Sequence, residues 1–104
     1  RTVRARLRLD DRVPDDAASQ PFAVRAADLD VLGHVNNAVY WAMAGECLDP
    51  ADGTPARVEL EHLHAVGAGA DLVLRHAGDR LWVCDGGRVA ATARRVVIAE
   101  PASR

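Results

Sequence analysis

The feature that most constrains the fold is a lone helical segment followed by a series of strands. Residues 37–48 (NAVYWAMAGECL) carry apolar side chains at helical spacing, on two adjacent lines of one helix face: Val39, Met43 and Cys47, and Tyr40, Ala44 and Leu48. Asn36 is a suitable N-cap, because its side-chain oxygen can accept a free first-turn amide. The helix should end before Pro50, since the residue ahead of a proline avoids helical angles. Gly45 costs about 1 kcal/mol in a helix relative to Ala, and we expect its missing side chain to let a sheet approach closely.

The rest of the chain consists mainly of strand-like segments joined by short turns. Their composition and alternation predict strands at residues 2–9, 22–26, 57–64, 70–76, 80–84 and 88–99. The connections AGD and DGG are of hairpin length, and hairpins join antiparallel strands. One helix must then cover an antiparallel sheet. The sequence therefore predicts an α+β domain with the helix against the concave face of the sheet.

The N-terminal part has a different character from the rest. Residues 10–21 (DDRVPDDAASQP) contain two aspartate pairs and two prolines, which is typical of a turn or linker. We expect residues 1–20 to be a strand and linker from a preceding segment, and residues 21–104 to form one domain. The chain starts with Arg1 next to a strand-like stretch, which suggests that it is part of a longer polypeptide.

Composition argues against several classes of function. The net charge of -2 provides no general attraction to nucleic acid or to anionic lipid. No apolar run approaches the ~20 residues that a membrane span requires. No signal peptide is visible, so we expect a cytoplasmic protein. Cys47 and Cys84 are too few for a disulfide framework or a zinc site, and we expect both to be reduced core residues.

A polar loop stands directly before the helical segment and carries a recognisable motif. The string DLDVLGHVNNAVYW (residues 28–41) resembles the motif Asp-x-x-Gly-His-Val-Asn-Asn-x-x-Tyr of hotdog-fold thioesterases. The matching residues are Asp30, Gly33, His34, Val35, Asn36, Asn37 and Tyr40. The wider layout is similar to the C-terminal hotdog domain of double-hotdog acyl-ACP thioesterases, in which a Glu follows the Tyr by six residues, here Glu46. The resemblance implies a hotdog fold, in which an antiparallel sheet wraps one long central helix.

The resemblance leaves two functions open. The first is an acyl thioesterase that hydrolyses fatty acyl-ACP or acyl-CoA to free fatty acid, in fatty acid biosynthesis or lipid metabolism. The alternative is a catalytically inactive hotdog half with a structural or acyl-binding role. Plant-type acyl-ACP thioesterases carry Asn where this chain has Leu32, and Glu and Cys where it has Ala65 and Val66, which favours the alternative. Single-hotdog acyl-CoA thioesterases tolerate other residues at the Leu32 position.

The motif residues have the chemistry that thioester hydrolysis requires. Asp30 could act as general base or as nucleophile, and His34 could orient the carbonyl or the water. A helix N-terminus offers free amides and a partial positive charge, so backbone N–H groups near Val35–Asn37 could bind the developing oxyanion. The apolar helix face and the sheet would supply a slot for the acyl chain.

Each of these residues also has a structural interpretation. Asn36 and Asn37 could hold the loop and the helix cap together. Tyr40 and Trp41 could simply pack, and Trp82 could belong to the core or an interface. Glu46 could reach the site from the helix or face solvent or a partner domain. We expect Asp28 to make local bonds within the loop.

We predict no cofactor and no metal. His62 and His64 share a strand face but lack an evident third ligand, so we expect these histidines and His76 to be solvated or packed. The arginines at positions 4, 6 and 8, and those at 94 and 95, could meet an acidic carrier protein or a CoA phosphate, although a solvated strand face is favoured. The predicted partners are an acyl carrier protein or CoA thioester as substrate, and a second hotdog domain or a homodimer partner.

Overall fold

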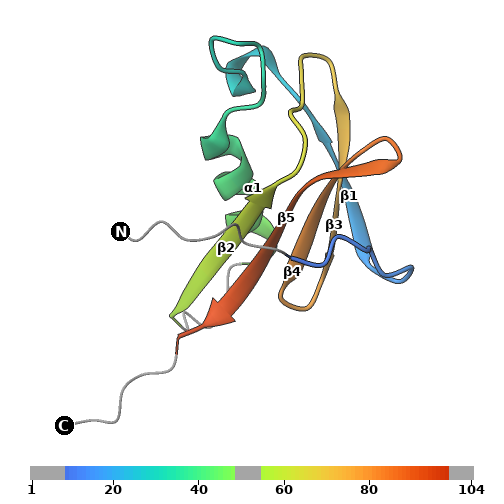
Figure 1. Ribbon diagram of the computed structural model, residues 1–104, viewed down its shortest axis with the longest axis vertical. Coiled ribbons are helices and arrows are strands. Elements are labelled where there is room, and N and C mark those ends of the chain that lie inside the picture. Colours follow the sequence, from blue (N-terminus) through green and yellow to red (C-terminus); the bar gives the residue numbers. More distant parts are fainter. Residues whose placement is uncertain (1–8, 49–54, 99–104) are drawn as a thin grey trace, which may run out of the picture.

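The computed structural model describes residues 9–48 and 55–98, and over these residues one α-helix covers one face of a five-stranded antiparallel sheet (Figure 1). The strands are β1 (Ala18–Ala23), β2 (Ala56–His62), β3 (Asp71–Ala77), β4 (Arg80–Asp85) and β5 (Arg88–Val97). The helix is α1 (Asn37–Leu48), and a short 3-10 helix, η1 (Ala26–Asp28), precedes it. The strand order is β1-β3-β4-β5-β2, and each neighbouring pair is antiparallel. The predicted α+β architecture is confirmed.

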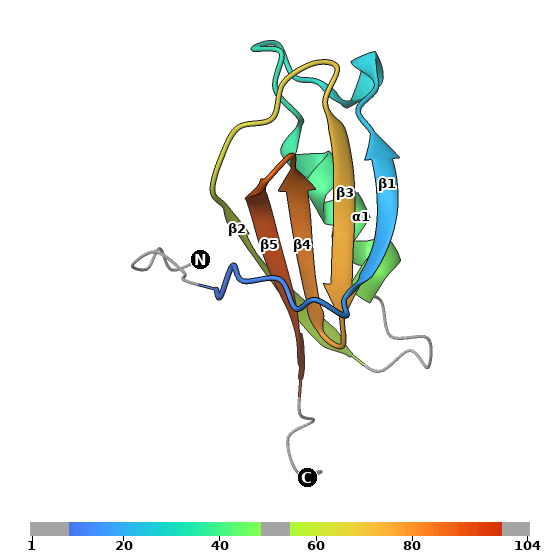
Figure 2. The ribbon, with the colours of Figure 1, turned by 90° about the vertical axis from the view of Figure 1, so that its right-hand side faces the viewer.

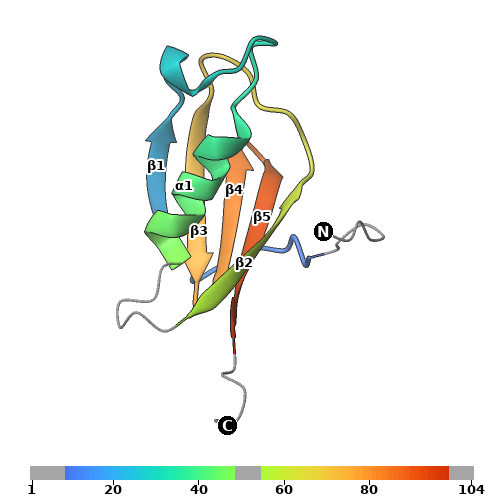
Figure 3. The same cartoon turned by 90° about the vertical axis from the view of Figure 1, so that its left-hand side faces the viewer.

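The helix begins and ends where the sequence predicts. Asn36 caps it, since its Oδ1 accepts the amide of Ala38 at 2.9 Å. The predicted apolar face packs on the sheet, and its fully buried members are Tyr40, Met43, Ala44 and Leu48. These side chains meet the inner faces of the strands, and Figure 3 shows α1 lying across that face.

Two predictions for the outer side of the helix are wrong. Gly45 is exposed, and a Cβ built there meets no atom within 4 Å, so no sheet approaches it. Trp41 packs only in part against the described residues, because 48% of its surface remains exposed. Both residues lie on the opposite side of α1 from Met43, since two residues along a helix correspond to a rotation of about 200°.

The first described strand starts earlier than predicted. β1 runs from Ala18 to Ala23 and includes Pro21, which the sequence places in a turn or linker. Because β1 is an edge strand, it tolerates a residue without an N–H group. The predicted strand at residues 22–26 therefore ends at Ala23. The strand predicted at residues 2–9 lies outside the described residues, apart from Leu9.

The segment of residues 9–17 crosses the outer face of the sheet, opposite the helix (Figure 2). Trp82 and Arg80 each donate a hydrogen bond to the carbonyl of Asp10, at 3.1 and 2.5 Å, and Leu9 donates its amide to Glu61 at 2.8 Å. Trp82 is thereby buried on the outer face, where Arg80 also stacks over its ring. The segment thus shields this part of the sheet.

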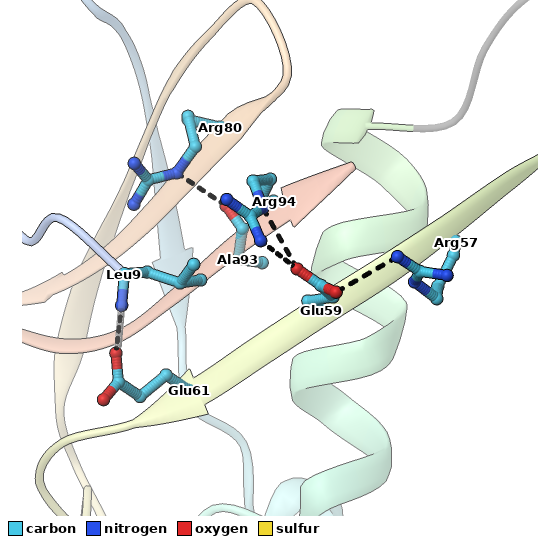
Figure 4. Close-up of polar contacts among 7 residues, drawn as sticks. All are labelled: Leu9, Arg57, Glu59, Glu61, Arg80, Ala93 and Arg94. Atoms are coloured by element: carbon cyan, nitrogen blue, oxygen red, sulfur yellow. Dashed lines mark hydrogen bonds and ion pairs between the residues drawn. The ribbon is translucent and has the colours of Figure 1, made fainter. Parts of the chain in front are cut away.

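The arginines of β5 have structural partners. Arg94 and Arg57 both pair with Glu59 across the outer face (Figure 4). Arg95 donates to the carbonyl of Leu48 at 3.0 Å, where a cation stabilises the negative end of the helix. The side chains of Arg94 and Arg95 also border a surface cavity of about 440 Å³ at the C-terminal end of β5. Arg4, Arg6 and Arg8 lie outside the described residues.

The two cysteines are free thiols, as expected, and both are half-buried. Burial raises the pKa of the Cys47 and Cys84 thiols. Among the described residues, no helix is long and apolar enough to cross a membrane.

Candidate functional site

The polar motif folds into a tight loop organised by Asp30. Its Oδ1 accepts the amides of Leu32 at 2.9 Å and of His34 at 3.1 Å. Its backbone also pairs with the loop, since the amide of Asp30 donates to the carbonyl of His34 at 2.8 Å and its carbonyl accepts from Gly33 at 3.0 Å. Gly33 has a φ of 77°, a left-handed conformation that glycine adopts without steric cost. The motif Gly is thus explained by the turn.

The residue that precedes the loop, Asp28, anchors it to the rest of the chain. Its buried carboxylate accepts three hydrogen bonds from Arg25, two from the guanidinium and one from the backbone amide. Its carbonyl accepts the amide of Asn36 at 2.8 Å. The bonds from Arg25 lower the pKa of Asp28 below its usual value. Asp28 therefore makes the local bonds that the sequence predicts.

The supply of free amides at the helix N-terminus is smaller than predicted. The amide of Val35 is donated to the carbonyl of Val66 at 2.8 Å, and that of Asn36 to Asp28. The amide of Ala38 is taken by the Asn36 cap. Neither Val35 nor Asn36 can therefore offer its N–H to an oxyanion. Within residues 35–38, only Asn37 has an amide with no acceptor among the described residues.

A surface cavity of about 320 Å³ opens at this end of the helix. The motif loop, the start of α1 and the segment after β2 line it: Asp30, His34, Val35, Asn37, Tyr40, His62, Leu63, His64, Ala65 and Val66. Two contacts hold the segment after β2 beside the loop, namely the Val35–Val66 hydrogen bond and a bridge between His34 and Gly67. The cavity thus brings together residues that are far apart in the sequence.

The groups in the cavity differ in their electrostatic setting. The hydrogen bond from the His34 amide, followed by that from Leu32, lowers the pKa of Asp30, so its carboxylate is ionised at neutral pH. Burial raises the pKa of Tyr40 and lowers that of His62, which keeps both groups neutral near pH 7. The Tyr40 and His62 rings meet edge to face, with centroids 4.8 Å apart.

The structure brings most of the predicted site residues to the cavity, but not all of them. Asp30, His34, Val35, Asn37 and Tyr40 line it. Three others do not line it: Gly33, which shapes the loop, Asn36, which caps the helix, and Glu46, which is exposed further along α1.

Of the three positions that depart from plant-type thioesterases, only two reach the cavity. Leu32 lies at the loop tip with 75% of its surface exposed and is not among the lining residues. Ala65 and Val66 line the cavity but carry no group that could act in catalysis.

Among the cavity residues that were not predicted, two carry titratable side chains, His62 and His64. From the sequence we expected solvated or packed histidines. The only indication that they belong to a site was their position at the end of a predicted strand. Among the described residues, no group of three or more His, Cys, Asp or Glu side chains is placed to hold a metal ion.

The chain matches the family model of the acyl-ACP thioesterase C-terminal domain over residues 12–85. It is also 35% identical over 63 residues to an uncharacterized protein of Mycobacterium tuberculosis, a match that covers 59% of this chain and 25% of the relative. The chain thus spans about a quarter of the length of the curated relatives it matches.

Solved structures with the same architecture are numerous. A Lactobacillus plantarum protein, provisionally named an oleoyl thioesterase, matches with a TM-score of 0.66 and 17% identity, over 96% of this chain and 45% of its own. A Thermus thermophilus thioesterase, complexed with coenzyme A and Zn, matches with a TM-score of 0.57 and 25% identity, over 79% of this chain and 78% of its own. The TT0310 protein from Thermus thermophilus matches with a TM-score of 0.60 and 21% identity, over 85% and 88%. The architecture is therefore the predicted hotdog fold.

Proposed function

Because the chain belongs to the family of acyl-ACP thioesterase C-terminal domains, we propose that it forms part of an enzyme that hydrolyses fatty acyl thioesters to free fatty acid and thiol. The observation that carries this proposal is the cavity at the start of α1. It gathers an ionised carboxylate, Asp30, an imidazole, His34, and the amide of Asn37, which has no acceptor among the described residues, beside an apolar helix face. These are the groups that polarise a carbonyl and direct an attack on it.

The geometry suggests a position for the scissile group. A thioester carbonyl at the N-terminus of α1 would meet the amide of Asn37 and the positive end of the helix dipole. The Asp30 carboxylate, fixed through its Oδ1, would act as nucleophile or base through its other oxygen. His34 would orient the carbonyl or the attacking water.

The carrier is an acyl carrier protein or CoA. The family description supports the first. The Thermus thermophilus thioesterase with bound coenzyme A supports the second. Cytoplasmic location and a role in fatty acid biosynthesis are parts of the same proposal.

We also propose that a second hotdog unit completes the site, from the same polypeptide or from a second copy. Several apolar side chains around the cavity and along the helix remain uncovered. Val31 at the loop tip is fully exposed, and Leu32 and Trp41 keep 75% and 48% of their surface exposed. The Lactobacillus plantarum relative, of whose length the match covers 45%, is compatible with two such units in one chain.

The test is hydrolysis of acyl-CoA and acyl-ACP thioesters by the purified full-length protein, followed by thiol release. Asp30→Asn keeps an Oδ1 acceptor for the two loop amides but removes the charge, whereas Asp30→Ala removes both. We expect Asp30→Asn to lower kcat by roughly 10²-fold or more in a protein that remains folded, as judged by a cooperative unfolding transition. Asp16→Asn, at an exposed turn on another side of the molecule, is the matched control and should retain full activity.

The outcomes distinguish an active thioesterase from a catalytically inactive hotdog half. Activity that survives Asp30→Asn would exclude a chemical role for that carboxylate. A wild-type protein that binds acyl thioesters but releases no thiol from any of them would favour the alternative, a catalytically inactive hotdog half with an acyl-binding role.

A further inference from the structure

His62 occupies a position in the cavity that the motif does not account for. It is the last residue of β2 and pairs with Ala91 of β5. Side chains alternate along a strand, so His62 shares the inner face with Val58 and Leu60, which pack on the core cluster. Its ring meets the edge of Tyr40 from α1, and both line the cavity with Asp30. The imidazole is therefore held on a paired strand at the border of the cavity.

The cavity needs a group that can take a proton from water. The Oδ1 of Asp30 already accepts two amides, and a carboxylate stabilised in this way is a weak base at neutral pH. Ala65 and Val66 hold no titratable group. Tyr40 keeps its proton, because burial raises its pKa. The remaining candidates are imidazoles, and a neutral imidazole is suited to proton transfer near pH 7.

Among the three histidines of the cavity, His62 is the most constrained. The side chains of all three are exposed, but His34 and His64 lie outside the named strands and helices, whereas His62 lies within a paired strand and its ring packs on Tyr40. A base fixed in this way loses little entropy when the water and substrate are in place. We propose that His62, in place of Asp30, is the general base that activates the hydrolytic water in this cavity. Asp30 then acts through its negative charge, which Asp30→Asn removes. The inference rests on the proposed thioesterase function and assigns a residue to it.

The step balances without any further reactant. One proton of the water passes to the imidazole of His62 as the water oxygen bonds to the carbonyl carbon. The amide of Asn37 donates to the resulting oxyanion. Collapse of this intermediate breaks the C–S bond, and the imidazolium returns its proton to the departing sulfur. A thioester and water thus become a carboxylic acid and a thiol, and His62 is regenerated. Asp30 keeps the loop in place and adds negative charge that stabilises the imidazolium.

The pH dependence of the rate is the distinguishing measurement. The titratable groups that share the cavity with His62 are Asp30, His34, Tyr40 and His64, and Asp85 acts on Tyr40 through its charge. Burial lowers the pKa of His62, so kcat/KM should rise with pH through a value below the ordinary ~6.5 of imidazole and then level off. His62→Gln should lower kcat/KM by roughly 10²-fold and abolish this limb, with KM little changed. His76→Gln, on β3 and outside the cavity, is the matched control and should change neither quantity.

A second variant distinguishes the loss of a catalytic group from misfolding. His62→Ala should regain part of its activity when imidazole is added to the assay, which a purely structural role would not produce. The proposal is overturned if His62→Gln keeps the wild-type pH profile, if His64→Gln abolishes the limb instead, or if imidazole restores nothing to a folded His62→Ala protein. In these cases the thioesterase function itself stands, because the wild-type protein is active. An inactive wild-type protein would instead refute both the function and the role of His62.

Discussion

Two glycines, Gly33 and Gly45, should respond in opposite ways to substitution by alanine. Gly45 lies inside α1, and Gly33 lies at the turn of the motif loop. A Cβ added at either position meets nothing within 4 Å, so packing contributes to neither change. The difference is in the backbone, since Gly33 has a φ of 77° whereas Gly45 is helical. Comparison of the two variants therefore isolates the effect of backbone conformation on the free energy of unfolding.

The magnitudes follow from the two conformations. Replacing a helical Gly by Ala stabilises by about 0.8–1.0 kcal/mol, whereas placing a Cβ in the left-handed region costs about 1–2 kcal/mol. One kcal/mol corresponds to roughly 4–8 °C in the unfolding midpoint of a domain near this size. Gly45→Ala should therefore raise the midpoint by about that amount, and Gly33→Ala should lower it by a similar or larger amount.

The assay is thermal and urea unfolding of both variants, together with thiol release from an acyl thioester. Gly45→Ala should retain wild-type activity, while Gly33→Ala should reduce it, because the loop that fixes Asp30 and His34 is distorted. If Gly45→Ala is neutral or destabilising, the reasoning from open space fails at this position, because the proposed second unit that covers Trp41 also covers Gly45, its neighbour one turn along α1. If Gly33→Ala is as stable as the wild type, the turn does not require its left-handed residue.

Two further predictions concern the scaffold. Thr92 is fully buried, and its hydroxyl donates to the carbonyl of Leu81 at 3.0 Å and accepts from Arg80 at 2.6 Å. Thr92→Val should therefore lower the free energy of unfolding by about 1–3 kcal/mol in urea titrations without changing kcat/KM. An unaltered unfolding midpoint would contradict a stabilising role for these hydrogen bonds. The pKa values of Asp28 and Asp30 are lowered in the folded state, so their stabilising contribution is complete above the unfolded value of ~3.9 and is lost as the pH falls through the folded values. Asp28→Asn should flatten the fall of the unfolding midpoint on acidification, and an acid limb as steep as that of the wild type would exclude the Arg25–Asp28 contact as its source.

Local chemistry in the sequence was sufficient for the helix and the motif loop. The Asn36 cap, the apolar periodicity up to Leu48 and the short turns act over a few residues, so they predict the helix bounds and the antiparallel pairing correctly. The loop is similarly local, because the side chain and backbone of Asp30 bond only to residues two to four positions ahead. Hence the sequence alone determined where the polar motif lies and which residues begin the helix.

Hydrogen bonds between residues that are far apart in the sequence determined the strand bounds and the composition of the cavity. Pro21 could enter a strand only because β1 is at an edge, which depends on the order of the whole sheet. The amide of Val35 is consumed by Val66, thirty-one positions along the chain, and the same contact brings the end of β2 and its His62 to the motif. A backbone amide can bind a substrate only if no distant group of the protein accepts its hydrogen bond. The periodicity of the sequence does not show which distant groups do so. The tertiary structure therefore left the amide of Asn37 without an acceptor in the described part of the chain and placed the imidazole of His62 at the cavity.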